Sequence, residues 1–360
     1  MKRHGCLWAD ITSFENLLWA YRKARRGKRS RDEVAEFDLN LEKELLQLQN
    51  ALRVRAYCPG SYRVFTIYER KPRQICAAPF RDRVVHHALM NIVDPLLDRC
   101  FIHDSYACRP GRGVHKAVTR YQVWAKRHAY ALKLDVARYF PNIDHVILKR
   151  QLRRRIKDPN VLWLLDCIID KSPEYVPETP MYFPGDDLFT PFERKKALPI
   201  GNLTSQFLAN LYLNDLDHFI KEDLKVKCYL RYVDDLVLLA NSKSQLHEWT
   251  IAIAEKLIDL RLRFHPKKVN IFQVRLGVDV LGYRVFPGYR MLRDDNGHRF
   301  ARKLRSFAQA YREGTMDWDD FNPGVQGWIG HARHADTLGL RRTIFHSTVF
   351  SREKGNVCRA

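Results

Sequence analysis

The chain has 360 residues, 46% of them hydrophobic, and its 62 lysines and arginines exceed its 41 aspartates and glutamates to give a formal net charge of +21. This composition excludes a disordered or low-complexity chain, and the longest apolar runs are too short to cross a bilayer. The eight cysteines form no C-x-x-C pair, which argues against a zinc ribbon or a disulfide framework and favours free thiols in a reducing cytosol. We therefore expect a soluble, cytoplasmic protein with no membrane partner, whose positive charge binds a polyanion such as nucleic acid.

The first third of the chain predicts helices interrupted by one hairpin. A capping-box pattern at Thr12 and Glu15 opens a helix that stops at Gly27, and regular leucines predict a second helix over 38–55. Residues 62–79 read as two short strands with Lys71-Pro72-Arg73 at their turn, followed by a helix over 80–98.

The remainder mixes strands and helices. A strand that ends near residue 135 is followed by a helix from 145, a proline-rich irregular insertion over 172–197, and a long helix over 204–224. A hairpin around residue 234, a helix over 243–261 and a basic helical region over roughly 300–350 complete the pattern. This order predicts an α+β fold, a sheet with helices on one face, and not the regular alternation of a doubly wound fold.

Three aspartates lie in unusually apolar surroundings. Asp234 and Asp235 interrupt the strand-like run "YLRYVDDLVLLA", and Asp135 ends the strand "YALKLDV". If neighbouring strands bring them together, the carboxylates repel one another and raise their pKa values unless a cation such as Mg²⁺ intervenes. An adjacent aspartate pair alone is more often a turn or surface feature, and an aspartate dyad for acid–base hydrolysis also fits it.

Six stretches of sequence, found in a fixed order along the chain, place the three aspartates within a longer motif pattern. They are "KPRQICAAPFRDRVVHHAL", "SYACRPGRGVHKA", "LKLDVARYFPNIDH", "LPIGNLTSQFLANLYLNDLD", "YVDD" and "LGYRV". Together they resemble the fingers and palm blocks of reverse transcriptases. Within that group the chain most resembles the enzymes of diversity-generating retroelements, because Ile200 stands where intron and retroviral enzymes usually carry glutamine, and the block ends in Ser205-Gln206 and not Ser-Pro. The segment "GWIGHARHADTLGL" resembles the thumb of the same subfamily.

The resemblance implies a right-hand polymerase. It places a basic helical extension at 1–64, fingers at 65–130, a palm at 131–285 with an antiparallel sheet and helices on one face, and a helical thumb with a tail at 286–360. Asp135, Asp234 and Asp235 fall on the catalytic triad, and the Val136 carbonyl would help them to bind two Mg²⁺ ions, for which Mn²⁺ can substitute.

The resemblance also assigns residues around the incoming dNTP. Lys71 and Arg73 would hold the triphosphate, Arg138 and Tyr139 would offer backbone amides to it, and Phe140 would exclude a ribose 2′-hydroxyl. The remaining assignments are Ile200, Gly201 and Gln206 beside the nascent base pair, Lys268 near the pyrophosphate, and Leu281, Gly282 and Tyr283 in the primer grip. Without the resemblance, Lys71 and Arg73 are an exposed basic turn, and Phe140 and Ile200 are core residues.

The resulting hypothesis is an RNA-templated DNA polymerase that copies a template-repeat RNA into adenine-mutagenised cDNA, the step that underlies mutagenic retrohoming. The resemblance implies template RNA, cDNA, dNTPs and a pentameric, barrel-shaped accessory variability protein as partners, in a prokaryotic or phage-infected cell. A retron, a free-standing group II intron-type enzyme, a host-captured defence enzyme, a non-catalytic RNA-binding scaffold and a metal-dependent nuclease remain as alternatives. The pair His331 and His334 has no third ligand in the sequence, which favours a packed or RNA-facing thumb helix over a metal site.

Overall fold

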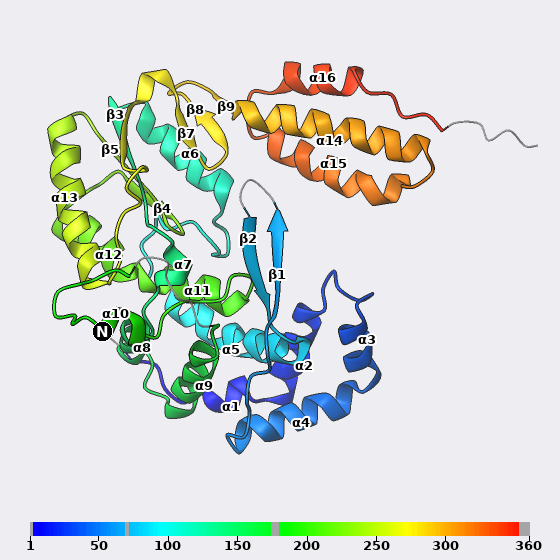
Figure 1. The fold of residues 1–360 in the computed structure, drawn as a ribbon, viewed down its shortest axis with the longest axis vertical. Coiled ribbons are helices and arrows are strands. Elements are labelled where there is room, and N and C mark those ends of the chain that lie inside the picture. Colours follow the sequence, from blue (N-terminus) through cyan, green and yellow to red (C-terminus); the bar gives the residue numbers. More distant parts are fainter. Residues whose placement is uncertain (1–2, 69–71, 174–179, 353–360) are drawn as a thin grey trace, which may run out of the picture. The chain divides into compact units, whose positions relative to one another are not determined.

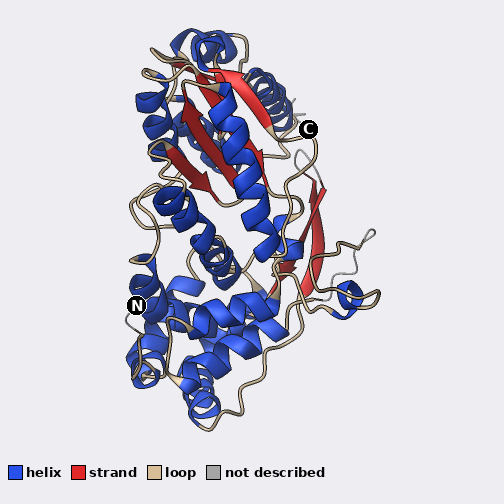
Figure 2. Cartoon of the chain, turned by 90° about the vertical axis from the view of Figure 1, so that its left-hand side faces the viewer, coloured by secondary structure: helices blue, strands red, loops and turns tan. Residues whose placement is uncertain are grey.

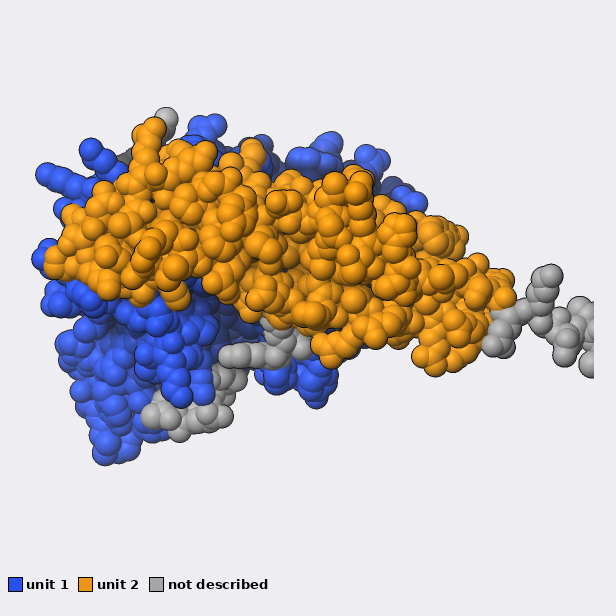
Figure 3. Space-filling view, turned by 90° about the horizontal axis from the view of Figure 1, so that it is seen from above, with its two compact units in different colours: residues 1–112, 133–237, 247–270 blue, residues 113–132, 238–246, 271–360 orange. Residues whose placement is uncertain are grey.

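The computed structural model describes residues 3–68, 72–173 and 180–352 (Figure 1). These residues form two compact units, coloured separately in Figure 3. The first comprises residues 1–112, 133–237 and 247–270, and the second comprises residues 113–132, 238–246 and 271–360. Each unit is described by itself.

The first unit begins with a helical layer. Its helices are α1 (Trp8–Ile11), α2 (Phe14–Ala24), α3 (Asp32–Leu39), α4 (Leu41–Arg53) and α5 (Phe80–Asp98). The apolar faces of α2 and α5 pack against each other, and Leu45, Leu48 and Leu52 of α4 are buried. The helix predicted over 80–98 is thus confirmed as α5, whereas the one predicted over 38–55 begins only at Leu41.

The capping prediction at the start of α2 was wrong by one residue. Ser13, and not Thr12, is the N-cap, and its hydroxyl accepts a hydrogen bond from the Asn16 amide at 3.2 Å. Thr12 instead closes α1, since its hydroxyl donates to the Trp8 carbonyl at 2.9 Å. The short helix before α2, which the sequence pattern did not indicate, therefore decides which hydroxyl acts as the cap.

The strands form three sheets, shown in red in Figure 2. The predicted hairpin is confirmed as β1 (Arg63–Tyr68) and β2 (Pro72–Ala77), which pair antiparallel. Of the predicted turn residues, Pro72 and Arg73 belong to β2, where they pair with Tyr68 and Ile67, and Lys71 lies outside the described residues. The main sheet has the order β4-β5-β3-β6, and the third sheet, antiparallel, has the order β7-β8-β9. Their strands are β3 (Tyr130–Asp135), β4 (Tyr229–Tyr232), β5 (Asp235–Ala240), β6 (Asn270–Gln273), β7 (Val278–Val280), β8 (Tyr283–Val285) and β9 (Arg290–Leu292).

Further helices complete the first unit. They are α7 (Tyr139–Asn142), α8 (His145–Arg153), α9 (Pro159–Asp170), α10 (Thr190–Glu193), α11 (Leu203–Tyr212) and α12 (Asn214–His218). A π-helical turn, Phe219–Asp223, follows α12, so the single long helix predicted over 204–224 is in fact three consecutive segments. The predicted insertion over 172–197 is irregular in its described part apart from α10, and its residues 174–179 lie outside the described ranges.

The second unit contains α6 (Val114–Ala125) and three C-terminal helices, as the helical prediction for 300–350 requires. These are α14 (Asp294–Arg312), α15 (Trp318–Ala332) and α16 (Leu338–His346). Phe300, Leu304, Phe321, Val325 and Ile344 form the core between them. Helix α13 (Lys243–Asp259), the predicted helix over 243–261, spans residues of both units. No helix among the described residues is long and apolar enough to cross a membrane.

The architecture confirms a mixed helix-and-sheet fold. The seven cysteines that the structure describes are all free thiols, as expected.

Candidate active site

The three aspartates lie at one edge of the main sheet. Asp135 is the last residue of β3, Asp235 is the first residue of β5, and β3 and β5 are neighbours in the sheet. Asp234 lies with Val233 in the two-residue connection between β4 and β5, a length that only an antiparallel hairpin allows. Strand order therefore brings together carboxylates that are 99 residues apart in the chain.

The electrostatics confirm this proximity. Burial, together with the charges of Asp235 and Asp135, raises the pKa of Asp234 to about 6. Burial also raises the pKa of Asp235, with Asp135 acting in the same direction, whereas Lys133 and Lys268 oppose the shift. The fold thus holds mutually repelling carboxylates in a poorly solvated place, and structural stability alone does not explain that arrangement.

Lys268 contacts the carboxylates directly. Its Nζ lies 2.6 Å from Oδ2 of Asp135, and the segment that carries it is fixed because the His265 amide donates to the Asp135 carbonyl at 2.8 Å. The resemblance placed Lys268 near the pyrophosphate. In this structure its ammonium group partly neutralises the aspartate cluster.

The donor set fits a divalent cation in its chemistry. Among the described residues, no group of three or more His, Cys, Asp and Glu side chains is arranged to hold a metal ion. The raised pKa values of Asp234 and Asp235 nevertheless mark a deficit of positive charge that Lys268 alone does not balance. Asp135, Asp234 and Asp235 offer only oxygen donors, the kind that Mg²⁺ and Mn²⁺ prefer.

The residues after Asp135 turn sharply into a short helix. Arg138 has a left-handed φ of +44° immediately before α7, and buried Tyr139 donates its hydroxyl to the Ala209 carbonyl. Phe140 is half-buried, and its carbonyl accepts a hydrogen bond from the Leu198 amide at 3.0 Å. This partial burial leaves both the sugar-contacting role and the alternative, a core aromatic, as predictions.

The loop before α11 is tied to the β1–β2 hairpin. The Ile200 carbonyl accepts a hydrogen bond from the Cys76 amide at 2.9 Å. Gly201 has φ +119°, and a Cβ added there would lie 3.0 Å from the Ile75 side chain, so both conformation and space require glycine. Arg73 is exposed on β2, and Lys71 lies outside the described residues.

Gly201 and Gln206 line a cavity of about 320 Å³. Its other walls include five basic side chains that the sequence reasoning did not assign to the site: Lys28, Arg31, Arg83, His86 and His87. Burial, with smaller contributions from neighbouring basic groups, lowers the pKa of His86 to about 3 and of His87 to about 4, so both imidazoles are neutral at pH 7. The positive charge of the cavity therefore comes from Lys28, Arg31 and Arg83, and the basic run "YRKARRGKRSR", which contains Lys28 and Arg31, was the signal that pointed to it.

The predicted primer-grip residues lie in the second unit. Leu281 (φ +48°) and Gly282 (φ +93°) connect β7 to β8, and two positive φ values in a two-residue hairpin are the conformation that glycine accommodates best. Glycine is thus needed here for the turn itself. Tyr283 is buried, with its hydroxyl 2.9 Å from Nδ1 of His331.

A third histidine, His115, which the sequence did not link to the His331/His334 pair, packs against it. The His115 ring on α6 stacks on His334 with 3.5 Å between ring centroids, and its Nδ1 lies 3.2 Å from the Tyr283 hydroxyl. Burial lowers the pKa values of His115 and His331, and His334 repels both. The three imidazoles are packed against one another, as the packed-helix interpretation expects.

Residues 67–285, which include the aspartate cluster, Lys268 and the predicted primer-grip residues, match the family described as reverse transcriptase (RNA-dependent DNA polymerase). The chain belongs to this family.

The reverse transcriptase assignment is accompanied by similarity to individual curated proteins. Protein YkfC of Escherichia coli strain K12 is 26% identical over 273 residues, 64% of this chain and 66% of that protein. Group II intron-encoded protein LtrA of Lactococcus lactis subsp. cremoris is 25% identical over 189 residues, 52% of this chain and 29% of LtrA. Nuclear intron maturase 1, mitochondrial, of Arabidopsis thaliana is 24% identical over 182 residues, 39% of this chain and 26% of that protein. The matched regions thus span just under two thirds of YkfC and less than a third of the other two.

Within the first unit, the described members of the predicted catalytic and nucleotide-binding set fall in part into two groups. Asp135, Asp234, Asp235 and Lys268 form one electrostatically coupled cluster, and Gly201 and Gln206 form part of one cavity. The individual roles of these residues stay predictions.

Proposed function

We propose that this chain is an RNA-templated DNA polymerase that uses dNTPs and divalent cations. The observation that carries the proposal is the cluster of Asp135, Asp234 and Asp235 within the region that matches the family, where burial and mutual repulsion raise the pKa of Asp234 to about 6. A non-catalytic RNA-binding scaffold has no need for this destabilising arrangement.

In this proposal the three aspartates, with the Val136 carbonyl, hold the cations. Bound divalent cations would supply the charge that activates a primer 3′-hydroxyl and stabilises the leaving pyrophosphate. Lys268 would then be freed from Asp135 to meet the phosphates of the dNTP, together with Arg73 and Lys71. Phe140 would stand against the sugar and exclude a 2′-hydroxyl.

The cationic cavity supports a nucleic acid substrate beside Gly201. Lys28, Arg31 and Arg83 bring fixed positive charge to a pocket that is large enough for a phosphate and a sugar. We propose that it takes the phosphate backbone of the template strand. The basic surplus of the whole chain supports the same conclusion.

We further propose that the enzyme serves a diversity-generating retroelement, with a barrel-shaped accessory protein as partner. Ile200 supports this subtype, because an aliphatic side chain beside the nascent base pair lacks the hydrogen-bonding amide of glutamine. An enzyme of the group II intron type is the second candidate, supported by the intron proteins among the relatives.

One experiment separates these possibilities. The purified chain is given a mixed-sequence RNA, an annealed DNA primer, Mg²⁺ and four dNTPs, and its cDNA is sequenced beside that of an Asp234→Asn/Asp235→Asn control. Product that is absent from the control supports the polymerase, and errors concentrated opposite template adenines support the retroelement subtype. Accurate product supports the intron type instead. Absence of product, even after cognate RNA and the accessory protein are added, would refute the polymerase.

A further inference from the structure

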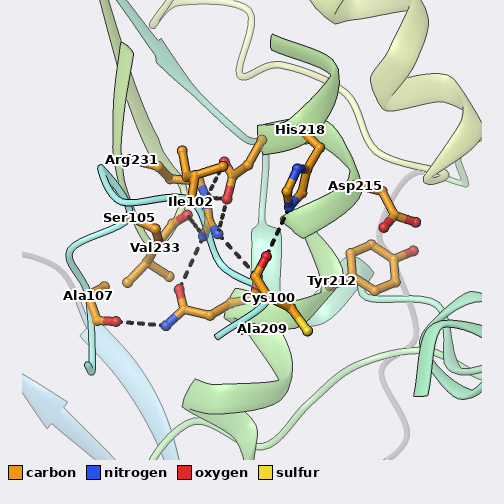
Figure 4. Close-up of polar contacts among 12 residues, drawn as sticks. Cys100, Ile102, Ser105, Ala107, Ala209, Tyr212, Asp215, His218, Arg231 and Val233 are labelled. Carbon is orange, nitrogen blue, oxygen red and sulfur yellow. Dashed lines mark hydrogen bonds and ion pairs between the residues drawn. The ribbon is translucent and has the colours of Figure 1, made fainter. Parts of the chain in front are cut away.

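A buried arginine lies directly beneath the turn that carries Asp234. Arg231 is on β4, three residues before Asp234, and its side chain is completely excluded from solvent. Burying a guanidinium is costly unless each of its five N–H donors finds an acceptor. Figure 4 shows the Arg231 side chain at the centre of a set of polar contacts.

Every donor of Arg231 is used. Nε donates to the Asp217 carboxylate at 2.8 and 3.0 Å, and Nη2 donates to Oδ2 of Asp217 at 2.6 Å and to the Asn210 carbonyl at 3.1 Å. Nη1 donates to Oδ1 of Asn210 at 3.1 Å and to the Val233 carbonyl at 3.0 Å. One planar group therefore joins α11, α12 and the catalytic turn.

The partners of Arg231 are themselves fixed. Buried Asp217 also accepts the Tyr229 hydroxyl at 2.6 Å, and Asn210 donates to the Ala107 carbonyl at 2.7 Å. The backbone of Arg231 is held as well, because its amide donates to the Asp104 carbonyl at 3.0 Å and its carbonyl accepts from the Tyr106 amide at 2.9 Å. The guanidinium thus cannot shift without disrupting several elements.

Val233 is the one partner whose conformation is strained. Its φ is +56°, in the left-handed region that a β-branched residue seldom adopts. The Val233 carbonyl belongs to the peptide unit that leads into Asp234. A hydrogen bond that fixes this carbonyl therefore fixes the direction in which the Asp234 side chain leaves the backbone.

We propose that Arg231 is a positioning residue of the active site, which holds the Val233–Asp234 peptide so that Asp234 and Asp235 face Asp135. This inference rests on the proposed polymerase function. Its geometric basis is the set of hydrogen bonds from Arg231 to Asn210, Asp217 and Val233. Asn210 lies on α11, the helix that begins just after Gly201. The same guanidinium therefore also holds α11 in a fixed position relative to the Val233–Asp234 turn.

The main test is Arg231→Lys, which keeps the charge but supplies donors from a single nitrogen and cannot reach all three elements. The matched control is Arg155→Lys. Arg155 is also buried and pairs with Asp215 of the same α12 at 3.5 Å, and its other acceptors are the Gln151 carbonyl at 3.3 Å and the Asn214 side-chain oxygen at 2.8 Å. Both variants lose a contact between a buried arginine and an aspartate of α12, and only Arg231→Lys loses the bond to Val233.

Each variant is measured for urea stability, kcat and KM for dNTP, and Mn²⁺ binding followed by electron paramagnetic resonance without substrates. For folded Arg231→Lys we expect kcat to fall about 10–100-fold and Mn²⁺ affinity to fall about tenfold, with KM little changed. Arg155→Lys should lose stability but keep kcat and Mn²⁺ affinity within about twofold. Equal kcat and equal Mn²⁺ affinity in the two variants would overturn the proposal.

A rescue variant tests the mechanism itself. Glycine adopts a positive φ without strain, so Arg231→Lys/Val233→Gly should recover part of the lost Mn²⁺ affinity and kcat. No recovery would contradict the role assigned to Val233.

If Arg231→Lys does not fold, Arg231→Met/Asp217→Leu replaces the ion pair by apolar groups of similar size, a swap that buried pairs often tolerate. Wild-type Mn²⁺ affinity in that folded variant would refute the positioning role. Because Mn²⁺ binding needs no DNA synthesis, a wild-type protein that makes no cDNA would count against the proposed function and leave this comparison intact.

Discussion

At the scale of single residues, the candidate active site is defined by carboxylates that the fold keeps partly buried and close together, although both conditions disfavour their charged forms. Asp234 and Asp235 are only partly exposed, and both carry raised pKa values, because burial and neighbouring carboxylates disfavour their ionised forms. Lys268 relieves the charge on Asp135. The aspartates are thus better suited to bind a cation than to stabilise the protein without one. Replacing one of these carboxylates should therefore raise stability but abolish activity.

The first prediction concerns Asp234→Asn without divalent cations. The pKa of Asp234 is about 6 in the folded protein and near 3.8 unfolded, so the folded state binds more protons and the wild type loses stability as pH rises from about 4 to 6. The variant lacks this loss, and at pH 7 it should be more stable by about 1–3 kcal/mol, a gain that shrinks toward pH 4. Urea denaturation across pH 4–8 measures the difference.

The control for this prediction is Asp223→Asn, which changes an exposed carboxylate after α12. It should show no comparable dependence on pH. A pH-independent difference between Asp234→Asn and the wild type would contradict the electrostatic origin of the strain. Polymerase activity of Asp234→Asn should be lost at every pH, since the variant removes a proposed cation ligand.

The second prediction concerns Phe140→Ala. Loss of the ring should let the site accept ribonucleotides and narrow the preference for dCTP over CTP by about 10–100-fold in kcat/KM. The backbone bond between the Phe140 carbonyl and the Leu198 amide is retained, so the fold should survive. Phe189→Ala, which truncates an aromatic ring that is 65% exposed, is the control. Unchanged discrimination in Phe140→Ala would remove this residue from the sugar site.

The third prediction tests the subtype through Ile200→Gln. A restored amide beside the nascent base pair should lower the error frequency opposite template adenines relative to the other three bases. Sequencing of cDNA from the wild type and the variant on one template gives the comparison. An adenine error frequency that is high in both proteins would show that Ile200 does not cause it.

At the scale of elements, the loop before α11 is shaped by its contact with β2. The Cys76–Ile200 hydrogen bond and the tight approach of Gly201 to Ile75 hold the hairpin against the nucleotide-side helix. The hairpin is exposed along most of its length, and this contact joins its partly buried end to the loop before α11. A substitution at Gly201 should therefore displace the β1–β2 hairpin relative to α11, and not only the Ile75 side chain.

The fourth prediction compares Gly201→Ala with Gly185→Ala. Both glycines have positive φ, +119° and +88°, but only Gly201 has a neighbour within 4 Å of the added Cβ. Each variant should lose about 1 kcal/mol or more to backbone strain, and Gly201→Ala should lose more and also raise KM for dNTP. Denaturation and steady-state kinetics give the two quantities. Equal losses, with equal KM, would show that the Ile75 contact has no role.

At the scale of the whole molecule, the surplus of positive charge governs how nucleic acid is held. A net charge of +21 predicts binding that weakens steeply with salt, because each phosphate contact releases counterions. The basic cavity beside Gly201 concentrates part of this charge at one place.

The fifth prediction is that Lys28→Ala/Arg31→Ala weakens RNA binding and makes it less dependent on salt. Each lost phosphate contact should reduce the slope of log Kd against log salt by about 0.7–1. Fluorescence anisotropy with a labelled RNA at several KCl concentrations measures the slope. Lys256→Ala, which breaks a surface pair with Asp259 at 2.9 Å, is the control. A slope equal to that of the wild type would exclude the cavity from the RNA path.

The sequence by itself determined the types of element and singled out the three aspartates proposed to be catalytic. Hydrophobic periodicity is a local property, so α5, β3, the β4–β5 hairpin and the C-terminal helices follow directly from it. The aspartates stand out because a carboxylate in an apolar strand pattern is costly without a compensating cation, and the resemblance assigned them to a catalytic triad. Gly201 and Gly282 were assigned through the resemblance alone.

Only the tertiary structure decided which side chains meet across the chain. Lys268 lies against Asp135, His115 stacks on His334, and Arg231 reaches Asn210, Asp217 and Val233, all through contacts between residues that no local pattern links. The cap at Ser13 also depends on a neighbour, because the Thr12 hydroxyl is already bonded within α1. The break between α11 and α12 likewise depends on other elements, to which Asn210 and Asp217 are hydrogen-bonded. Propensity sets what a segment can form, and the pairing of buried polar groups decides how the segments end and where they meet.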